Sequence, residues 1–382
     1  STALFIISLS WLDGIWNTIL EASTDAGGHV RVVTKQYSER ESLHPLDENI
    51  EEMSELLELL RSQRDVKAVF PVIQSGATVS AGDEIGDVFG SVIGAPSDYF
   101  TRYWDVDAKQ VEGRWFAENR GELVIGKKLA DLAHAHVGDE IVALGQTQDG
   151  SLSPIKGKLV GIVRSGGPMI DRSVFVELKT MQWMVDIPQG ATKLVIYGDD
   201  YRNAQDLHAQ LNLLPQLQAY DLRAWQNLAP WDSQLPMMNG VKYMLIVVVV
   251  FLAALGVWNT MMMSVLERTT EIGVLRAMGM TRFGAVVLFV VEASTIALIG
   301  GAVGVLAGAL ATLYMEGIGI RIPEKLMAQI EIPFNDTMYA QLNMETLVMA
   351  YCTALITAFL GSLLPSIRAA SIAPVVAMRS NR

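Results

Sequence analysis

Long apolar runs alternate with polar stretches along this chain. Three runs, at residues 244–266, 283–315 and 346–364, carry almost no charge. Each comes close to or exceeds the roughly 20 apolar residues with which a helix crosses about 30 Å of hydrocarbon. They predict three complete membrane spans. The opening stretch STALFIISLSWLDGIW is typical of the outer part of a fourth span, and we expect the beginning of that span to lie upstream.

Residues 22–240 follow a different pattern. HVRVVTKQY and VKAVFPVIQSGATVS predict strands on either side of the helix DENIEEMSELLELLRSQ, where Ile50, Met53, Leu57 and Leu60 recur at helical spacing. ELVIG, EIVALG, KGKLVGIV, SVFVEL and TKLVIYG predict further strands, and YRNAQDLHAQLNLL predicts a second amphipathic helix. The order is strand, helix and strand at both ends with a β-rich insertion between, which predicts a mixed α/β domain.

Charge gives the expected orientation. The chain has 29 Lys and Arg and 41 Asp and Glu, a net charge of −12. Residues 241–382 contain nine Lys and Arg against eight Asp and Glu, so residues 1–240 carry −13. Lys and Arg in short loops favour the cytoplasmic side, and arginines gather in two segments outside the apolar runs: Arg268, Arg276 and Arg282 in one, and Arg368, Arg379 and Arg382 in the other. We therefore expect both segments to be cytoplasmic.

The predicted fold class is an α-helical membrane protein with four transmembrane helices, the first one truncated here, plus a large mixed α/β extracytoplasmic domain. We expect a multi-pass protein of a bacterial inner membrane with this domain in the periplasm. The expected divisions are the first transmembrane helix and stalk at 1–21, the periplasmic domain at 22–240, transmembrane helices at 241–266, 283–315 and 344–366, a cytoplasmic helix at 267–282, an extracytoplasmic loop at 316–343 and a cytoplasmic tail at 367–382.

The domain carries no recognisable catalytic motif. GELVIGKKL places Gly121 and Gly126 before Lys127 at Walker A spacing, but Lys128 stands where the Mg²⁺-binding Ser or Thr is required. His134 and His136 have no Cys or acidic partner at metal-ligand spacing, which favours surface histidines. The single cysteine, Cys352, excludes an intramolecular disulfide. We expect no catalytic residue and no metal site.

Two features within the third apolar run depart from a plain lipid-facing helix. Gly300, Gly304 and Gly308 place small residues at every fourth position, which lets another helix approach closely. That helix belongs either to the same bundle or to a second subunit. Glu292 is an ionisable group within a span, and such a group is either functional, paired with a neighbouring helix, or extended toward the interface.

The segment ERTTEIGVLRAMGMTR, at residues 267–282, separates two apolar runs and predicts a short amphipathic helix. Such a helix either lies on the lipid surface or docks into a soluble partner, and its composition does not choose between them. Its apolar side consists of Ile272, Leu275, Met278 and Met280, and its polar side of Glu267, Arg268, Glu271 and Arg276.

The stretch ERTTEIGVLRAMGMTRFGAVVLFVVEASTIALIGGAVGVLAGA resembles the signature of the FtsX-like, MacB-type (type VII) ABC transporter permeases. LLPSIRAASIAPVVAMR, WLDGIWNTILEASTDAGGHVRV, ELVIGKKLADLAHAHVGDEIVAL and YDLRAWQNLAP resemble further motifs of this family, so the resemblance covers nearly the whole chain. Met280 departs from it, since the family more often has a small or polar residue there. The likeness is greatest to the lipoprotein-releasing LolC/LolE branch. MacB-type efflux is the alternative, and FtsX-like regulators are less similar because their extracytoplasmic domain is smaller.

The resemblance implies a permease without catalytic activity that works by mechanotransmission, in which closure of partner ATPases moves the membrane helices. It implies two copies of an ABC ATPase subunit that hold ATP and Mg²⁺, a second permease copy or paralogue, a periplasmic carrier or adaptor, and surrounding lipids. No cofactor is expected on this chain and no nucleic acid as partner. The residues that would couple to the ATPase are Glu267, Arg268, Thr269, Glu271, Ile272, Gly273, Leu275 and Arg276.

For a lipoprotein cargo, acyl chains need an apolar path out of the bilayer, which we expect between the first and second spans of two facing permeases. Residues three to five apart share a helix face, which selects the candidates. For each one the alternative is a side chain that faces lipid or packs within the bundle. The candidates are Leu4, Phe5, Leu9, Leu12 and Ile15 on the first span and Leu245, Val249, Leu252 and Val257 on the second.

Overall fold

The computed structural model describes residues 2–51, 53–81, 88–103, 110–117, 121–164, 170–321 and 337–371. The chain divides into two units. The helical unit comprises Ser1–Asn17, Pro236–Arg321 and Thr337–Arg382, and the described part of the sheet unit lies within Thr18–Leu235. Arg379 and Arg382, which contribute to the expected orientation, lie outside the described residues.

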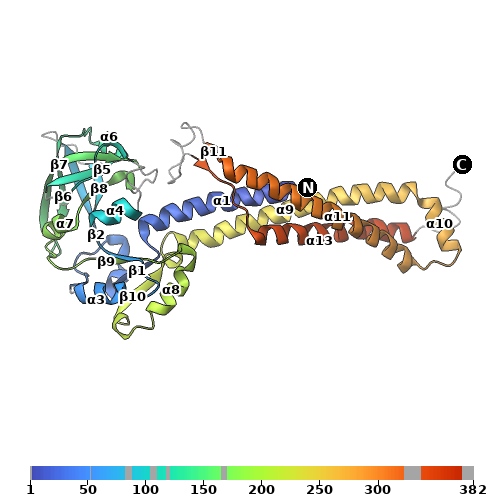
Figure 1. Ribbon diagram of the computed structural model, residues 1–382, viewed down its shortest axis with the longest axis horizontal. Coiled ribbons are helices and arrows are strands. Elements are labelled where there is room, and N and C mark those ends of the chain that lie inside the picture. The colour runs from blue at the N-terminus through green and yellow to red at the C-terminus, as the bar shows by residue number, and fades with distance from the viewer. Residues whose placement is uncertain are drawn as a thin grey trace. The chain divides into compact units, whose positions relative to one another are not determined.

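Four long helices dominate the described part of the helical unit: α1 (Thr2–Gly27), α9 (Trp231–Glu267), α11 (Arg282–Ile318) and α13 (Met344–Ser371) (Figure 1). All four are long and apolar enough to cross a membrane by length and composition. Helices α9 and α11 have 37 residues each, about 55 Å at 1.5 Å per residue, which exceeds the hydrocarbon thickness. Helix α9 begins ten residues before the expected span because the helix continues through the polar segment WDSQLPMMNG.

Short elements complete the described part of the helical unit. Helix α10 (Thr269–Ala277) links α9 to α11, and β11 (Ile320–Arg321) pairs antiparallel with β12 (Thr337–Met338). One apolar cluster joins α1, α9 and α13 around Phe5, Leu9 and Ala350. A second cluster joins α9, α10, α11 and α13 near the α10 end; it consists of Met261, Val265, Ile272, Phe289, Ala293 and Ala369.

The sheet unit begins and ends with the predicted strand, helix and strand. Strands β1 (Val30–Thr34), β2 (Ala68–Ala81), β9 (Lys193–Tyr197) and β10 (Tyr220–Ala224) form an antiparallel sheet in the order β10-β1-β9-β2. Helix α3 (Met53–Arg61) lies between β1 and β2 in the chain and α8 (Ala204–Leu211) between β9 and β10, and in each case one other strand separates the two in the sheet. This is a split β-α-β arrangement, and the predicted mixed α/β content is confirmed.

The β-rich insertion lies between β2 and β9. Its strands pair so that β2, β3, β8, β5, β7 and β6 form a closed ring, since β6 pairs with both β2 and β7. Sequence patterns predicted β5 to β8 but not β3, β4 or the closure. The elements of the insertion are β3 (Val88–Ala95), α4 (Ser97–Tyr103), β4 (Gln110–Gly113), β5 (Glu122–Gly126), α6 (Lys127–Leu132), β6 (Glu140–Gln146), β7 (Leu152–Val163), β8 (Ser173–Glu177) and α7 (Leu178–Val185).

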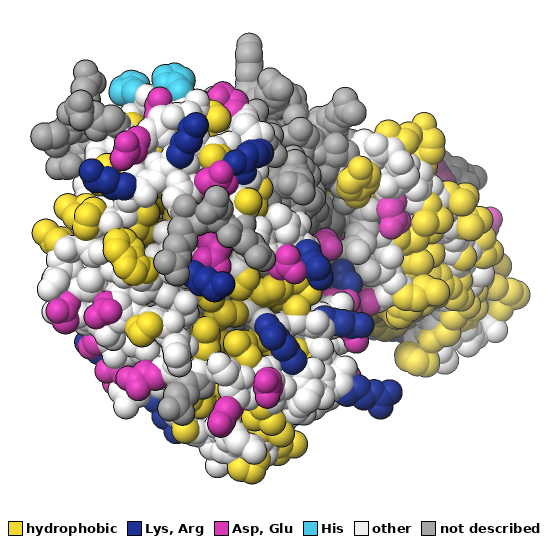
Figure 2. All heavy atoms as spheres, turned by 60° about the vertical axis from the view of Figure 1, so that its left-hand side comes forward, with side chains coloured by type: hydrophobic (Ala, Val, Ile, Leu, Met, Phe, Trp, Pro, Cys, Tyr) yellow, Lys and Arg dark blue, Asp and Glu magenta, His cyan; other side chains and the backbone are white. Residues whose placement is uncertain are grey.

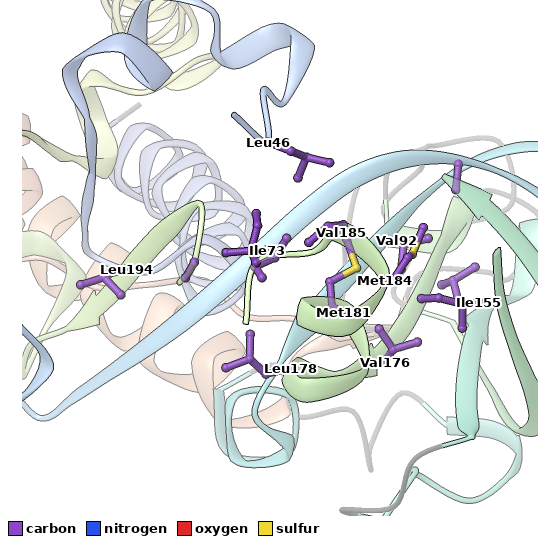
Figure 3. Close-up of a cluster of buried hydrophobic side chains, with 14 of the residues drawn as sticks. Leu46, Ile73, Val92, Ile155, Val176, Leu178, Met181, Met184, Val185 and Leu194 are labelled. Carbon is purple, nitrogen blue, oxygen red and sulfur yellow. The ribbon is translucent and has the colours of Figure 1, made fainter. Parts of the chain in front are cut away.

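Helix α7 packs onto the ring of strands, where its side chains join the main core (Figure 3). Two glycines make room for it. A Cβ atom at Gly94 would lie 2.1 Å from the Cβ of Met181, and one at Gly145 would lie 2.3 Å from the Cε of Met184. At Gly94 a larger residue would require α7 to move, because the close atom is fixed to the helix backbone, whereas at Gly145 the flexible end of the Met184 side chain would have to move.

The end of α1 joins the sheet unit through GGHV. Gly28 has a φ of +79°, and a Cβ there would lie 2.2 Å from Cγ1 of Val195, so this turn requires glycine. Tyr197 Oη donates a hydrogen bond of 2.6 Å to the carbonyl oxygen of Asp25 in α1. The backbone N–H of Gly198 donates to Nδ1 of His29 over 3.0 Å. These bonds fix the helix end against β9.

Charged side chains of both signs are interspersed over much of the visible surface, and another part of it is mostly hydrophobic (Figure 2). Many exposed hydrophobic side chains belong to the long helices α9 and α11. The expected surface histidines, His134 and His136, are both exposed. His29 differs from them, because it is only 8% exposed. Burial lowers the pKa of His29 from 6.5 to about 4, an effect that Asp200 partly opposes.

We predict a pH dependence that originates at His29. The folded pKa lies below the unfolded one, so the stability that neutral His29 contributes is fully present above pH 6.5 and is lost as pH falls toward 4. Relative to His29→Asn, which keeps an acceptor but does not titrate, the wild-type chain should lose about 3 kcal/mol over this range. Hydrogen exchange of β1 and β9 amides, corrected for intrinsic rates, measures it. The same pH slope in both chains would contradict the assignment.

Candidate functional site

The segment between α9 and α11 folds as its residues predict. Helix α9 ends at Glu267, the chain bends at Arg268, and α10 follows. Gly279 then adopts a φ of +107°, a left-handed conformation that ends helices readily. Thr281 caps α11, since its Oγ1 accepts a hydrogen bond of 3.0 Å from the N–H of Gly284. Helix α10 is thus a separate short helix between two helices of 37 residues.

Helix α10 has a buried side and an exposed side. Ile272 and Gly273 are buried, and Ile272 packs in the cluster with Val265 and Phe289. Met278, expected on the apolar side, is 72% exposed. Of the predicted coupling residues, Glu267, Arg268 and Glu271 are exposed, Thr269, Leu275 and Arg276 are half-buried, and Ile272 and Gly273 anchor the helix. A partner could therefore contact a surface of mixed charged and apolar character.

An ion pair fastens the start of α10 to α11. Nη1 of Arg268 lies 3.0 Å from Oε1 of Glu292, and the two side chains are partly exposed. Of the three roles left open for Glu292, the structure shows a pairing with a neighbouring segment. This pair and the packing of Ile272 with Phe289 connect α10 to α11.

Helix α1 packs against α11 at two of the three glycines that are spaced four residues apart. A Cβ at Gly304 would lie 2.8 Å from the Cβ of Thr2, and one at Gly308 would lie 3.0 Å from Cδ1 of Ile6. A Cβ at Gly300 would meet nothing within 4 Å among the described residues. Thr2, which Gly304 meets, is the first residue of α1 that the structure describes, so the described part of α1 contacts this series at Gly304 and Gly308. At Gly300 the alternative of a second subunit stays open.

Two other glycines complete the packing of the bundle. A Cβ at Gly301 of α11 would lie 3.3 Å from the Tyr351 ring of α13. A Cβ at Gly361 of α13 would lie 2.9 Å from the carbonyl oxygen of Ala254 in α9. Small residues allow such close approach of helix backbones in lipid. Neither glycine was predicted from the sequence to be a packing position.

We predict different outcomes for the same substitution at two glycines of α11. Gly308→Leu should destabilise the helical unit by about 1 to 3 kcal/mol, because its side chain has to displace α1. Gly300→Leu should change stability by less than about 0.5 kcal/mol, since it enters open space. Thermal unfolding of the two purified variants in detergent measures the difference. Equal losses would exclude close packing of α1 at Gly308 as the cause.

The candidate acyl-chain path falls into two groups. Phe5 and Leu9 are buried, and Leu245 and Val249 pack against their cluster, so contacts within this chain account for these four. The other positions are more accessible or contact other helices. Leu4 and Leu252 are exposed, Leu12 and Ile15 are half-buried, and Val257 packs against Gly361. The path itself remains a prediction.

A polar group in the bundle was missed from the sequence. Asp13 is the one charged residue among residues 2–20, and its carboxylate lies 2.8 Å from Nζ of Lys242 on α9. Thr346 Oγ1 of α13 donates to the same carboxylate over 3.2 Å. A lone charge within an apolar run was the available signal. Among the residues that the structure describes, no group of His, Cys, Asp or Glu could hold a metal ion.

Two families of known proteins match this chain. Residues 1–213 match the MacB-like periplasmic core domain, and residues 243–374 match the FtsX-like permease C-terminal region. The chain therefore belongs to the family of FtsX-like permeases with a MacB-like periplasmic core domain, the type VII ABC transporter permeases.

Relatives in several bacteria are similar at low identity. The lipoprotein-releasing system transmembrane protein LolC of Neisseria meningitidis is 22% identical, over 85% of this chain and 80% of that protein. LolC of Xylella fastidiosa is 29% identical, over 67% of this chain and 64% of that protein. The macrolide export ATP-binding/permease protein MacB of Acinetobacter baylyi is 26% identical over 84% of this chain. The chain spans about half the length of the MacB relatives it matches.

Proposed function

We propose that this chain is the permease subunit of a transporter that couples ATP hydrolysis in a partner to movement of a periplasmic domain. We further propose that the cargo is a lipoprotein, drawn from the inner membrane toward a periplasmic carrier. The observation that supports the coupling is α10, whose buried side is anchored in the bundle while Glu267, Arg268 and Glu271 remain exposed.

Helix α10 is well placed to pass on a displacement. It is joined to α9 directly, to the helix cluster through Ile272, and to α11 through the Arg268–Glu292 pair. Helix α9 runs without a break from Glu267 to Trp231, and the boundary between the two units falls within it, at Leu235 and Pro236. Pro236 has no N–H to donate, but α9 stays helical through it, so α9 can carry motion from α10 into the sheet unit.

The partners follow from this proposal. Two ABC ATPase subunits would hold ATP and Mg²⁺ and contact α10, and a second permease copy or paralogue would complete the membrane part. A periplasmic carrier or adaptor would receive the cargo. The names of the LolC relatives favour lipoprotein release, and that of the MacB relatives supports efflux as the second candidate. An FtsX-like regulator of an extracytoplasmic protein is a further alternative.

We predict that Glu271→Lys uncouples the transporter, because it reverses a charge on the exposed side of α10. Co-purification of the ATPase should weaken about tenfold, which is about 1.4 kcal/mol, and the ATPase rate of the complex should fall with it. The thermal unfolding midpoint should not change. Glu316→Lys, an exposed carboxylate at the far end of α11, is the control and should leave both values as they are. Wild-type coupling in the Glu271→Lys complex would argue against this role for α10.

We predict that acyl chains contact Leu4 and Leu252, which are 69% and 60% exposed. A photoreactive residue at either position should crosslink a triacylated lipoprotein in nanodiscs. Leu310 of α11 is also 60% exposed and serves as the matched control for random contact with lipid-borne cargo. Crosslinks from all three positions at equal yield would count against a path along α1 and α9. Crosslinks to a macrolide photoprobe, with none to lipoprotein, would assign the chain to efflux.

A further inference from the structure

A polar network ties together the end of the bundle at which α13 begins. Asp13 of α1 accepts hydrogen bonds from Lys242 of α9 and from Thr346 of α13, at 2.8 and 3.2 Å. Lys242 directly precedes the long apolar run of α9, and Thr346 is the third residue of α13. The carboxylate therefore binds two other helices at one level, at the opposite end of α9 from α10.

The segment between β12 and α13 extends this network along α1. The Asn17 amide donates to Oε1 of Gln341, and the N–H of Gln341 donates to the carbonyl oxygen of Ser10 over 3.0 Å. Gly14 is in direct contact with the backbone at Tyr339, and a Cβ there would lie 2.0 Å from that carbonyl oxygen. One face of α1 is thus fastened to residues 339–346, and Asp13 also reaches α9.

The ion pair is well shielded from solvent. The side chains of Asp13 and Lys242 are 13% and 27% exposed, against 50% and 33% for the Arg268–Glu292 pair at the α10 end. Ionised groups in this environment are unfavourable without a partner, and removal of one partner leaves the other charge uncompensated. The Asp13–Lys242 pair is thus the less exposed of the two and constrains where α1 and α9 can lie.

Apolar contacts also join α1 and α9. They involve Leu245 and Val249 packed against Phe5 and Leu9. Lipid chains are as apolar as these side chains. Separation of such surfaces within a bilayer therefore costs van der Waals packing but exposes no apolar surface to water. The charged contact therefore adds a cost to separation of α1 from α9 that the apolar contacts do not supply.

We propose that Asp13 and Lys242 form a latch that holds α1 against α9, and that this latch must open before the two helices can separate at this end of the bundle. The structure shows the closed state. The inference rests on the proposed function in one respect, since separation of α1 and α9 would open the path predicted for acyl chains.

Distance measurements between spin labels test the latch. Labels at Ser8 and Val247, which are exposed on α1 and α9, are introduced into the full chain in nanodiscs with Cys352→Ala as background. The wild-type chain should give one short distance. Asp13→Asn and Lys242→Met should each add a longer one, with at least a fivefold rise in its fraction. Asp13→Lys combined with Lys242→Asp should restore the short distance.

Matched variants separate the latch from general effects of charge removal or misfolding. Glu345 lies one residue before Thr346 and is exposed, so Glu345→Gln should leave the distance unchanged. Thr346→Val keeps the ion pair but removes its hydroxyl contact, and should produce a smaller rise in the long-distance fraction. An unchanged distribution in Asp13→Asn and Lys242→Met, or no recovery in the exchanged pair, overturns the proposal. The readout does not involve cargo, so failure of lipoprotein crosslinking would leave this result standing.

Discussion

Apolar helices in a bilayer gain no hydrophobic free energy by facing one another, since lipid chains solvate them equally well. The helical unit must therefore be held by close backbone contact and by directional polar bonds, and the structure has both. Glycines 301, 304, 308 and 361 bring helix pairs to within van der Waals contact. Two ion pairs, Arg268–Glu292 and Asp13–Lys242, add direction at opposite ends of α9. Asp13 and Glu292 interrupt apolar runs in the sequence, and each pairs with a charged residue of another segment.

The sheet unit differs from the helical unit in what stabilises it. Apolar burial stabilises it, and its core runs through both the four-stranded sheet and the closed ring, with α7 packed between side chains of the ring. The described part of the chain contains no disulfide, consistent with its single cysteine, Cys352, in α13. Within the closed ring each strand has a partner on both sides, which lowers the risk of edge-to-edge association there.

Much of this architecture could be read from residue patterns, because the patterns are local. Run length predicts the four apolar helices, and alternation predicts most strands. Pairings between distant segments leave no such local trace. Closure of the ring depends on β6 meeting both β2 and β7, and the Lys242 partner of Asp13 lies 229 residues away in the chain. The glycine spacing predicted close packing but not which helix packs at each position: Gly304 and Gly308 approach α1, whereas Gly300 meets no described residue within 4 Å.

The candidate coupling site shows the same division between local and distant signals. The sequence located α10 and its exposed Glu271, but it could not say that Ile272 would pack with Phe289 or that Arg268 would bind Glu292. Those contacts decide what α10 can do. A helix held only by its connecting turns would swing when pushed, whereas one anchored on α9, α11 and α13 moves the helices with it. The Arg268–Glu292 pair at this end is more exposed than the Asp13–Lys242 pair, so solvent screens it more. If α10 couples to an ATPase as proposed, the Asp13–Lys242 pair is the stronger polar constraint on how α9 can move relative to α1.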